Sequence, residues 1–119
     1  MRTLRFGAKT QTAGKFIRQL SSRDVYAHVE MVVEPTECSE LEVLWQASEN
    51  AIPKTMEEHV RRGIFVVLEK ENAKCLGTVV RIIGGSFNSI DSSPKCYEVA
   101  SAQAFSDAIA TAGIWGSEA

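Results

Sequence analysis

The 119-residue sequence has few of the groups that build metal, redox or covalent catalytic sites. It contains two histidines and three cysteines, and Cys38, Cys75 and Cys96 stand far apart without a C-x-x-C pair. Closely spaced cysteine and histidine residues are the usual zinc ligands, and paired cysteines carry out thiol exchange. We therefore expect three reduced thiols, no metal ion and no cofactor.

Long hydrophobic runs are also missing. No apolar stretch approaches the ~20 residues that a helix needs to cross a bilayer. The first ten residues, MRTLRFGAKT, are basic but lack the hydrophobic core of a signal peptide. We expect a soluble, cytoplasmic protein without membrane contact. The length, with 45% hydrophobic and 24% charged residues, predicts a single globular domain over residues 1–119.

Negative charge is absent from the N-terminal part of the chain. The formal net charge is −2, but residues 1–23 contribute +6 and the remainder −8. The six basic residues of this segment are Arg2, Arg5, Lys9, Lys15, Arg18 and Arg23. Such a segment can attract a polyanion, or it can pair with the acidic remainder of its own domain. Composition leaves both interpretations open.

Alternating hydrophobicity predicts the strands. The clearest example is residues 25–33, where every second side chain is apolar, as in a strand with one buried face. Residues 41–45 alternate more briefly, and TVVRII at 78–83 suits a central strand. Weaker strand signals lie in TLRFG at 3–7 and KFIRQ at 15–19.

Two local expectations follow from the clearest strand. Pro35 and the polar TECSE segment after it suit a hairpin that joins this strand to the next one. His28 and Glu30 lie on its mostly polar face, so we expect a solvated histidine rather than a metal ligand or a general base.

Two helices are predicted. The first begins near Pro53, and its apolar residues recur at spacings of three and four: Met56, Val60, Ile64, Val67 and Leu68. Gly63 interrupts this helix, which indicates close approach by a neighbouring element. The second begins after Ser93 as N-cap with Pro94 at the first helical position, and ends near Gly113. Its expected buried stripe is Val99, Ala102, Phe105 and Ile109.

The segment GGSFNSIDSSPKCYEVASAQAF, residues 84–105, has three possible interpretations: a phosphate cradle, a nucleophile turn or a helix cap. A phosphate cradle normally carries a lysine in G-x-x-x-x-G-K-[ST], and here Pro94 removes a donor while Asp91 repels an anion. A nucleophilic serine normally lies in G-x-S-x-G with an assignable acid and histidine, which are missing. We therefore interpret Ser93-Pro94 as a structural cap, Gly84-Gly85 as a turn after the strand, and GGSFNSI as an exposed loop. No enzymatic activity is predicted.

Three segments of the chain together resemble domain IV of the translation GTPase elongation factor G. They are GKFIRQLSSRDVYAHV at 14–29, AIPKTMEEHVRRGI at 51–64, and the segment at 84–105. The corresponding family patterns are G-K-F-x-R-Q-S-G-G-R-G-Q-Y-G-H-V, V-I-P-K-E-Y-x-x-x-V-x-x-G-I and D-G-S-Y-H-D-V-D-S-S-x-x-A-F, in the same order. The resemblance implies an α+β fold: a four-stranded sheet with two helices on one face and a left-handed βαβ crossover.

The resemblance also implies a function and its residues. Domain IV of that family inserts two tip loops into the decoding region of the small ribosomal subunit. The first loop corresponds to residues 20–25 and the second to residues 86–89. The implied RNA-binding residues are Arg18, Ser21, Ser22, Arg23, Phe87 and Asn88. Their implied partner is the small ribosomal subunit or another RNA, with no small-molecule substrate.

Several tip residues depart from the family pattern. Ser21, Ser22 and Asp24 replace glycines, Asp24 adds a charge that phosphates repel, and Asn88 replaces a histidine. The sequence also lacks the P-loop of a GTPase, so we expect one domain, either separate or cut from a larger factor. Two functions remain: a ribosome- or RNA-binding module, or a protein-interaction or self-association module that kept the scaffold, with the apolar GIWG segment around Trp115 as a packed tail or a partner site. The sequence does not indicate the oligomeric state.

Overall fold

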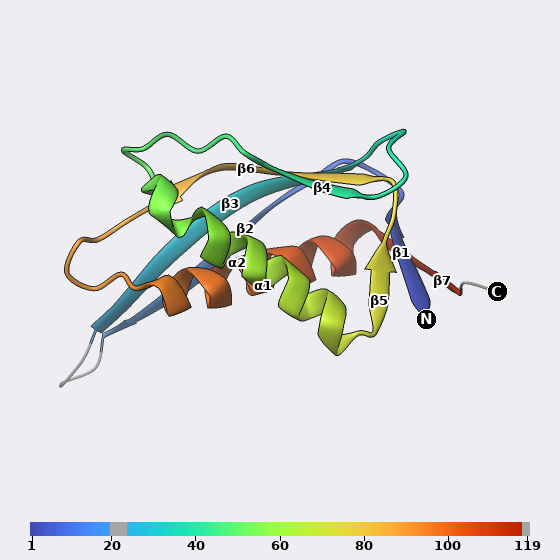
Figure 1. Cartoon of the computed structure of the whole chain (residues 1–119). Coiled ribbons are helices and arrows are strands. Elements are labelled where there is room, and N and C mark those ends of the chain that lie inside the picture. The colour runs from blue at the N-terminus through green and yellow to red at the C-terminus, as the bar shows by residue number, and fades with distance from the viewer. Residues whose placement is uncertain (20–23, 118–119) are drawn as a thin grey trace.

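A computed structural model describes residues 1–19 and 24–117 of the chain (Figure 1). Its elements follow one another as β1 (Arg2–Phe6), β2 (Thr10–Gln19), β3 (Asp24–Pro35), β4 (Leu41–Trp45), the 3-10 turn η1 (Lys54–Met56), α1 (Glu57–Lys70), β5 (Ala73–Cys75), β6 (Thr78–Ser86), α2 (Pro94–Ala112) and β7 (Gly113–Ser117). The block that they form is elongated, with principal extents of 50 × 26 × 21 Å.

The main sheet has four strands in the order β2-β3-β6-β4, and α1 and α2 cover one of its faces (Figure 1). Strands β2, β3 and β6 pair antiparallel, whereas β4 runs parallel to β6. The α+β class and the four-stranded sheet beneath two helices are therefore confirmed. A second, three-stranded sheet, β5-β1-β7, closes the end of the block where both termini lie.

The predicted hairpin between the strand at 25–33 and the strand at 41–45 is wrong. Strand β4 pairs instead with β6, on the edge away from β3, from Leu41 opposite Thr78 to Trp45 opposite Ile82. Strand β6 lies between β3 and β4, so it is central, as its β-branched sequence predicts. The chain returns from β4 to β6 through α1, and this is the βαβ crossover of the fold.

One hydrophobic core lies between the main sheet and the helices. Its largest fully buried side chains include Tyr97, Phe105, Leu4 and Met31. Helices α1 and α2 pack closely at Gly63. A Cβ at this position would overlap the backbone of α2 and lie 2.9 Å from the nitrogen of Ala102. The close neighbour expected at Gly63 is therefore confirmed as α2.

Two details of the C-terminal half differ from expectation. Of the stripe predicted for α2, Phe105 is fully buried and Ala102 and Ile109 are partly buried. The buried face is rotated from that stripe, and consists of Cys96, Tyr97, Ala100, Ser101, Ala104, Phe105 and Ala108. The glycine pair at 84–85 does not form a turn but lies inside β6, next to a bulge opposite Glu30 and Met31. Gly85 has φ +149°, and a Cβ there would overlap the carbonyl oxygen of His28, so only glycine fits.

The buried hydroxyl groups are hydrogen-bonded, and the cysteines, each in a described part of the chain, form no disulfide. The hydroxyl of Ser101 donates to the carbonyl of Val60 at 2.6 Å, and that of Thr78 to the carbonyl of Leu76 at 2.8 Å. All three cysteines are free thiols, with Cys38 exposed and the other two buried. Among the described residues, no helix is long and apolar enough to cross a bilayer.

Candidate functional site

The connection from β6 to α2, residues 87–93, lies at the end of the block opposite the termini (Figure 1). It is tied to β3 because the amide of Tyr26 donates to the carbonyl of Asp91 at 3.2 Å, and the Ser92 hydroxyl donates to the carbonyl of Tyr26 at 2.8 Å. Leu20, Ser21, Ser22 and Arg23 lie outside the described residues. The described residues that flank them, Gln19 and Asp24, end β2 and begin β3 at this same end. We call this end of the block the tip.

Asn88 organises the β6–α2 connection. Its side-chain oxygen accepts the amides of Ile90, at 2.9 Å, and Asp91, at 3.0 Å. Its own amide donates to the Ser92 hydroxyl at 3.0 Å, and its carbonyl accepts the Ser92 amide at 2.9 Å. An asparagine that bonds backbone groups two and three residues ahead fixes a turn. The Asn88 oxygen is thus engaged within the loop, and its side-chain NH₂ is the group left to meet a partner.

Phe87 anchors the same loop to the core. Its ring is half-buried and stacks on Tyr97, with ring centroids 6.1 Å apart. Tyr97 is fully buried, and its hydroxyl donates to the carbonyl of Ser86 at 2.6 Å. The sequence prediction assigned Phe87 a contact with RNA. The structure places much of this ring against the protein itself.

The predicted site omitted Ile90, which stands at the loop's apex with 88% of its surface exposed. Its exposure is higher than that of the other exposed large hydrophobic residues, Met1, Ile114, Ile17 and Phe65. The available sequence signal was a single isoleucine in an otherwise polar run, SFNSIDSSP. A helix or strand period cannot place such a residue.

The basic N-terminal segment divides into two parts. Arg2, near the termini, pairs with Glu71 at 2.7 Å and lies over the Trp115 ring at 3.8 Å. Arg2 thus bonds within its own domain, as one of the two interpretations of the charge pattern predicts. Lys15 and Arg18 on β2 are exposed, and among the described residues neither forms an ion pair. The Arg18 guanidinium lies 5.0 Å from the centroid of the Phe16 ring, close to the tip.

His28 lies on the sheet face away from the helices, and it is less solvated than expected. Its Nε2 is 3.1 Å from Glu30 Oε2, and its Nδ1 is 3.1 Å from Ser86 Oγ. Serine, histidine and carboxylate thus follow one another in the order of a hydrolase triad, but with the two ring nitrogens exchanged. The Ser86 hydroxyl is, however, also 2.6 Å from the Tyr26 hydroxyl, and Ser86 is paired with His28 across the β3–β6 ladder. We interpret the chain of bonds as a cross-strand link that holds the end of β6 beside β3.

Alkaline pH is expected to weaken the anchoring of the loop. Burial raises the pKa of the Tyr97 hydroxyl above its ordinary value, while the Ser92 hydroxyl lowers it by a smaller amount. The folded state therefore holds this proton more tightly than the unfolded state does. The stabilisation is complete below about pH 10, the ordinary tyrosine value, and is lost as the pH rises through the folded-state pKa.

The measurement is urea unfolding at about pH 8 and about pH 11 for the parent and for Tyr97→Phe. The phenylalanine variant has no phenolic proton at position 97 to lose, so its free energy of unfolding should fall less between the two values. The buried thiol of Cys75, whose pKa burial also raises, is common to both proteins and cancels. An equal fall in both proteins would contradict the expected role of Tyr97.

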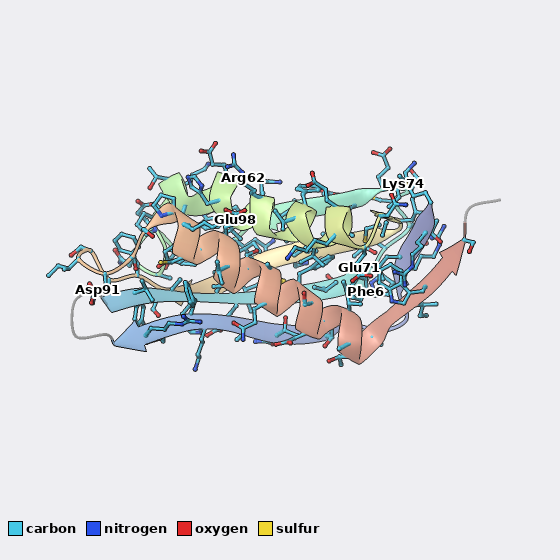
Figure 2. All side chains as sticks on the ribbon, turned by 90° about the horizontal axis from the view of Figure 1, so that it is seen from below. Phe6, Arg62, Glu71, Lys74, Asp91 and Glu98 are labelled. Atoms are coloured by element: carbon cyan, nitrogen blue, oxygen red, sulfur yellow. The ribbon has the colours of Figure 1, made fainter. Side chains whose placement is uncertain are left out.

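A hollow of about 560 Å³ lies at the opposite end of the block. Its lining includes Met1, Leu41, Phe65, Leu68 and Cys75. Figure 2 shows Asp91 at the tip and Lys74, which also borders the hollow, at the far end. In the part of the chain that the structure describes, no three histidine, cysteine, aspartate or glutamate side chains are grouped to hold a metal ion.

Comparison with known proteins agrees with the architecture. Residues 3–113 match the family described as elongation factor G, domain IV. An elongation factor G of Petrotoga mobilis is 29% identical over 115 residues, covering 84% of this chain and 15% of the relative. A crystal structure of a protein from Thermus thermophilus superposes with a TM-score of 0.85 at 22% identity, over 96% of this chain and 18% of that one. The chain thus spans less than a fifth of the length of either.

Proposed function

This chain belongs to the elongation factor G domain IV family, and on that premise we propose that it is a ribosome- or RNA-binding module of translation, acting in the cytoplasm without GTPase activity of its own. Domain IV of this family is a non-catalytic part of a translation factor. The proposed partner is the small ribosomal subunit or another RNA, contacted through the tip. The proposed contact residues on the N-terminal side are Arg18, Ser21, Ser22 and Arg23.

The observation that carries the proposal is that the β6–α2 loop lies beside the described ends of β2 and β3, at one end of a 50 Å block. The β6–α2 loop is bonded to β3 through Asp91 and Ser92, so it keeps a fixed position beside the end of the β2–β3 pair. A fixed projection of this kind can enter a confined RNA site with little loss of conformational entropy. Arg18 and Lys15 on β2 add positive charge next to it.

Binding to purified small ribosomal subunits tests the proposal. We expect the chain to co-sediment with the subunits at low salt and to be released as salt rises, because each neutralised phosphate releases counterions. Removing one phosphate contact should lower the slope of log affinity against log salt by about 0.8. Arg18→Ala and Arg23→Ala are each expected to do so.

The matched control is Arg5→Ala, because Arg5 is an exposed arginine on β1 at the far end of the block. This variant should bind with the parent's affinity and the parent's salt slope. A parent chain that stays in the supernatant at low salt would show the proposal to be wrong. If Arg18→Ala and Arg23→Ala both kept the parent's salt slope, the assignment of phosphate contacts to these arginines would be wrong.

The alternative function is a protein-interaction or self-association module. The hollow at the far end supports it, because the Phe65 side chain there is 47% exposed in largely apolar surroundings. The GIWG segment gives weaker support: it forms β7, and Trp115 is partly buried beneath Arg2. A chain that sediments as a concentration-dependent dimer and ignores ribosomal subunits would favour this alternative.

A further inference from the structure

The β6–α2 loop has no positive charge with which to attract RNA phosphates. Residues 87–93 include one aspartate, Asp91, and no lysine or arginine. The nearest basic residue in sequence, Lys95, already lies 3.3 Å from Glu98. Phosphate oxygens are attracted by cations and repelled by carboxylates, so this loop is unfavourable for the RNA backbone. Charge therefore favours a contact of this loop with a base or a sugar over one with the phosphate backbone.

Ile90 is the group that this loop presents to a partner. It is 88% exposed, while its backbone amide is held by Asn88. The turn beneath it is fixed by four hydrogen bonds within residues 88–92, and Ser92 ties that turn to β3. A β-branched side chain has restricted χ1 freedom, so a fixed backbone also limits where its methyl groups can lie. The apex is therefore a preorganised apolar knob.

The geometry points to a division of roles at the tip: Ile90 packs on the exposed face of an RNA base, and Arg18 on β2 supplies phosphate contact. This inference rests on the proposed function and adds the kind of contact that each of these two residues makes. Proteins recognise RNA sequences and loops largely through unstacked bases packed against side chains, and apolar wedges are used in the same way on DNA. Asn88 then acts as a positioning residue through its bonds to the turn, and its NH₂ group remains able to donate to a base edge.

The two kinds of contact differ in how they respond to salt. Burial of an apolar side chain releases no counterions, whereas each arginine–phosphate contact does. Ile90→Ala should therefore weaken binding to small ribosomal subunits about tenfold, or about 1.4 kcal/mol, at every salt concentration and leave the salt slope unchanged. Arg18→Ala should lower the slope.

The experiment measures the affinity of each variant for purified small subunits across a series of potassium chloride concentrations. Ile114→Ala is the matched control, because this isoleucine is 55% exposed on β7 at the opposite end. It should bind as the parent does, and Ile90→Val should retain most of the parent's affinity. Because the Ile90 side chain is exposed, its variants should unfold at the parent's temperature, so a binding defect is not a folding defect.

Chemical modification of the RNA bases in the same complexes identifies the contacted group. The parent should protect a small set of bases that Ile90→Ala leaves reactive. Parent-like affinity of Ile90→Ala, or a loss of affinity with no change in base protection, as expected for a contact with a ribosomal protein, would overturn the inference. Binding by the parent together with either result leaves the proposed function intact. Absence of parent binding overturns both.

Discussion

Gly14→Ala is expected to destabilise the protein by ~3 kcal/mol, at the upper end of the range for over-packing. Gly14 lies on β2 directly beneath α2, and a Cβ there would overlap the carbonyl oxygen of Ala100 and lie 2.7 Å from its carbonyl carbon. Both are backbone atoms of a helix, so no flexible side chain can move aside. The sheet and α2 would have to separate, and neighbouring buried contacts would be lost with them. Urea unfolding followed by circular dichroism measures the change.

Gly84→Ala provides the control. Gly84 is also a strand glycine, but the nearest atom to a Cβ at that position is the Glu30 carboxylate oxygen, 3.9 Å away. The same substitution there should change the free energy of unfolding by less than ~1 kcal/mol. If Gly14→Ala unfolded at the parent's urea concentration, β2 and α2 could not be packed as closely as the structure places them.

This close packing also explains why the hydrophobic pattern of the sequence predicted the wrong buried face for α2. Alanines occur all around this helix, so hydrophobicity alone did not distinguish the face that meets the sheet. That face carries Ala100, Ala104 and Ala108, all fully buried, because small side chains let a helix approach β2. The required size of a side chain depends on the neighbouring element, which a local pattern does not contain.

The prediction of strand pairing from sequence was limited for the same reason. Alternation located β3 and β4, because burial of one face is a local property. It did not identify the partner of β4, which is fixed by the long return through α1 to β6. The second sheet was largely invisible, since β5 has only three residues and β7 follows α2 without a break. The resemblance to a family supplied the main architecture that these patterns left open.

The tip illustrates how far residue types can predict a site. The family motif located the loop that contains Phe87 and Asn88, and the structure places that loop beside β3. The motif did not show which side-chain atoms form contacts within the protein and which remain exposed. The oxygen of Asn88 and much of the ring of Phe87 serve the loop itself, while Ile90 is exposed. That distribution depends on backbone geometry and becomes visible only when the hydrogen bonds are traced.

Tyr97→Ala is expected to have the largest effect on both stability and the tip, lowering the free energy of unfolding by ~3–5 kcal/mol, as for other large buried aromatic residues. The substitution removes a fully buried ring and leaves a cavity beneath the loop. It also removes the stacking partner of Phe87 and the hydroxyl that donates to the carbonyl of Ser86. Urea unfolding measures the first effect, and amide hydrogen exchange at residues 88–92 measures the second.

Phe105→Ala separates loss of core volume from loss of loop anchoring. Phe105 is also fully buried on α2, but its ring packs near Phe6 on β1, with centroids 5.9 Å apart, rather than beneath the loop. The two variants should lose similar global stability. Under native conditions the amides of Ile90, Asp91 and Ser92 should exchange faster in Tyr97→Ala alone, because only that variant loses the support beneath the turn. Equal exchange in both variants would mean that the bonds of Asn88 and Ser92 hold the turn without Tyr97, and that the core does not position the tip.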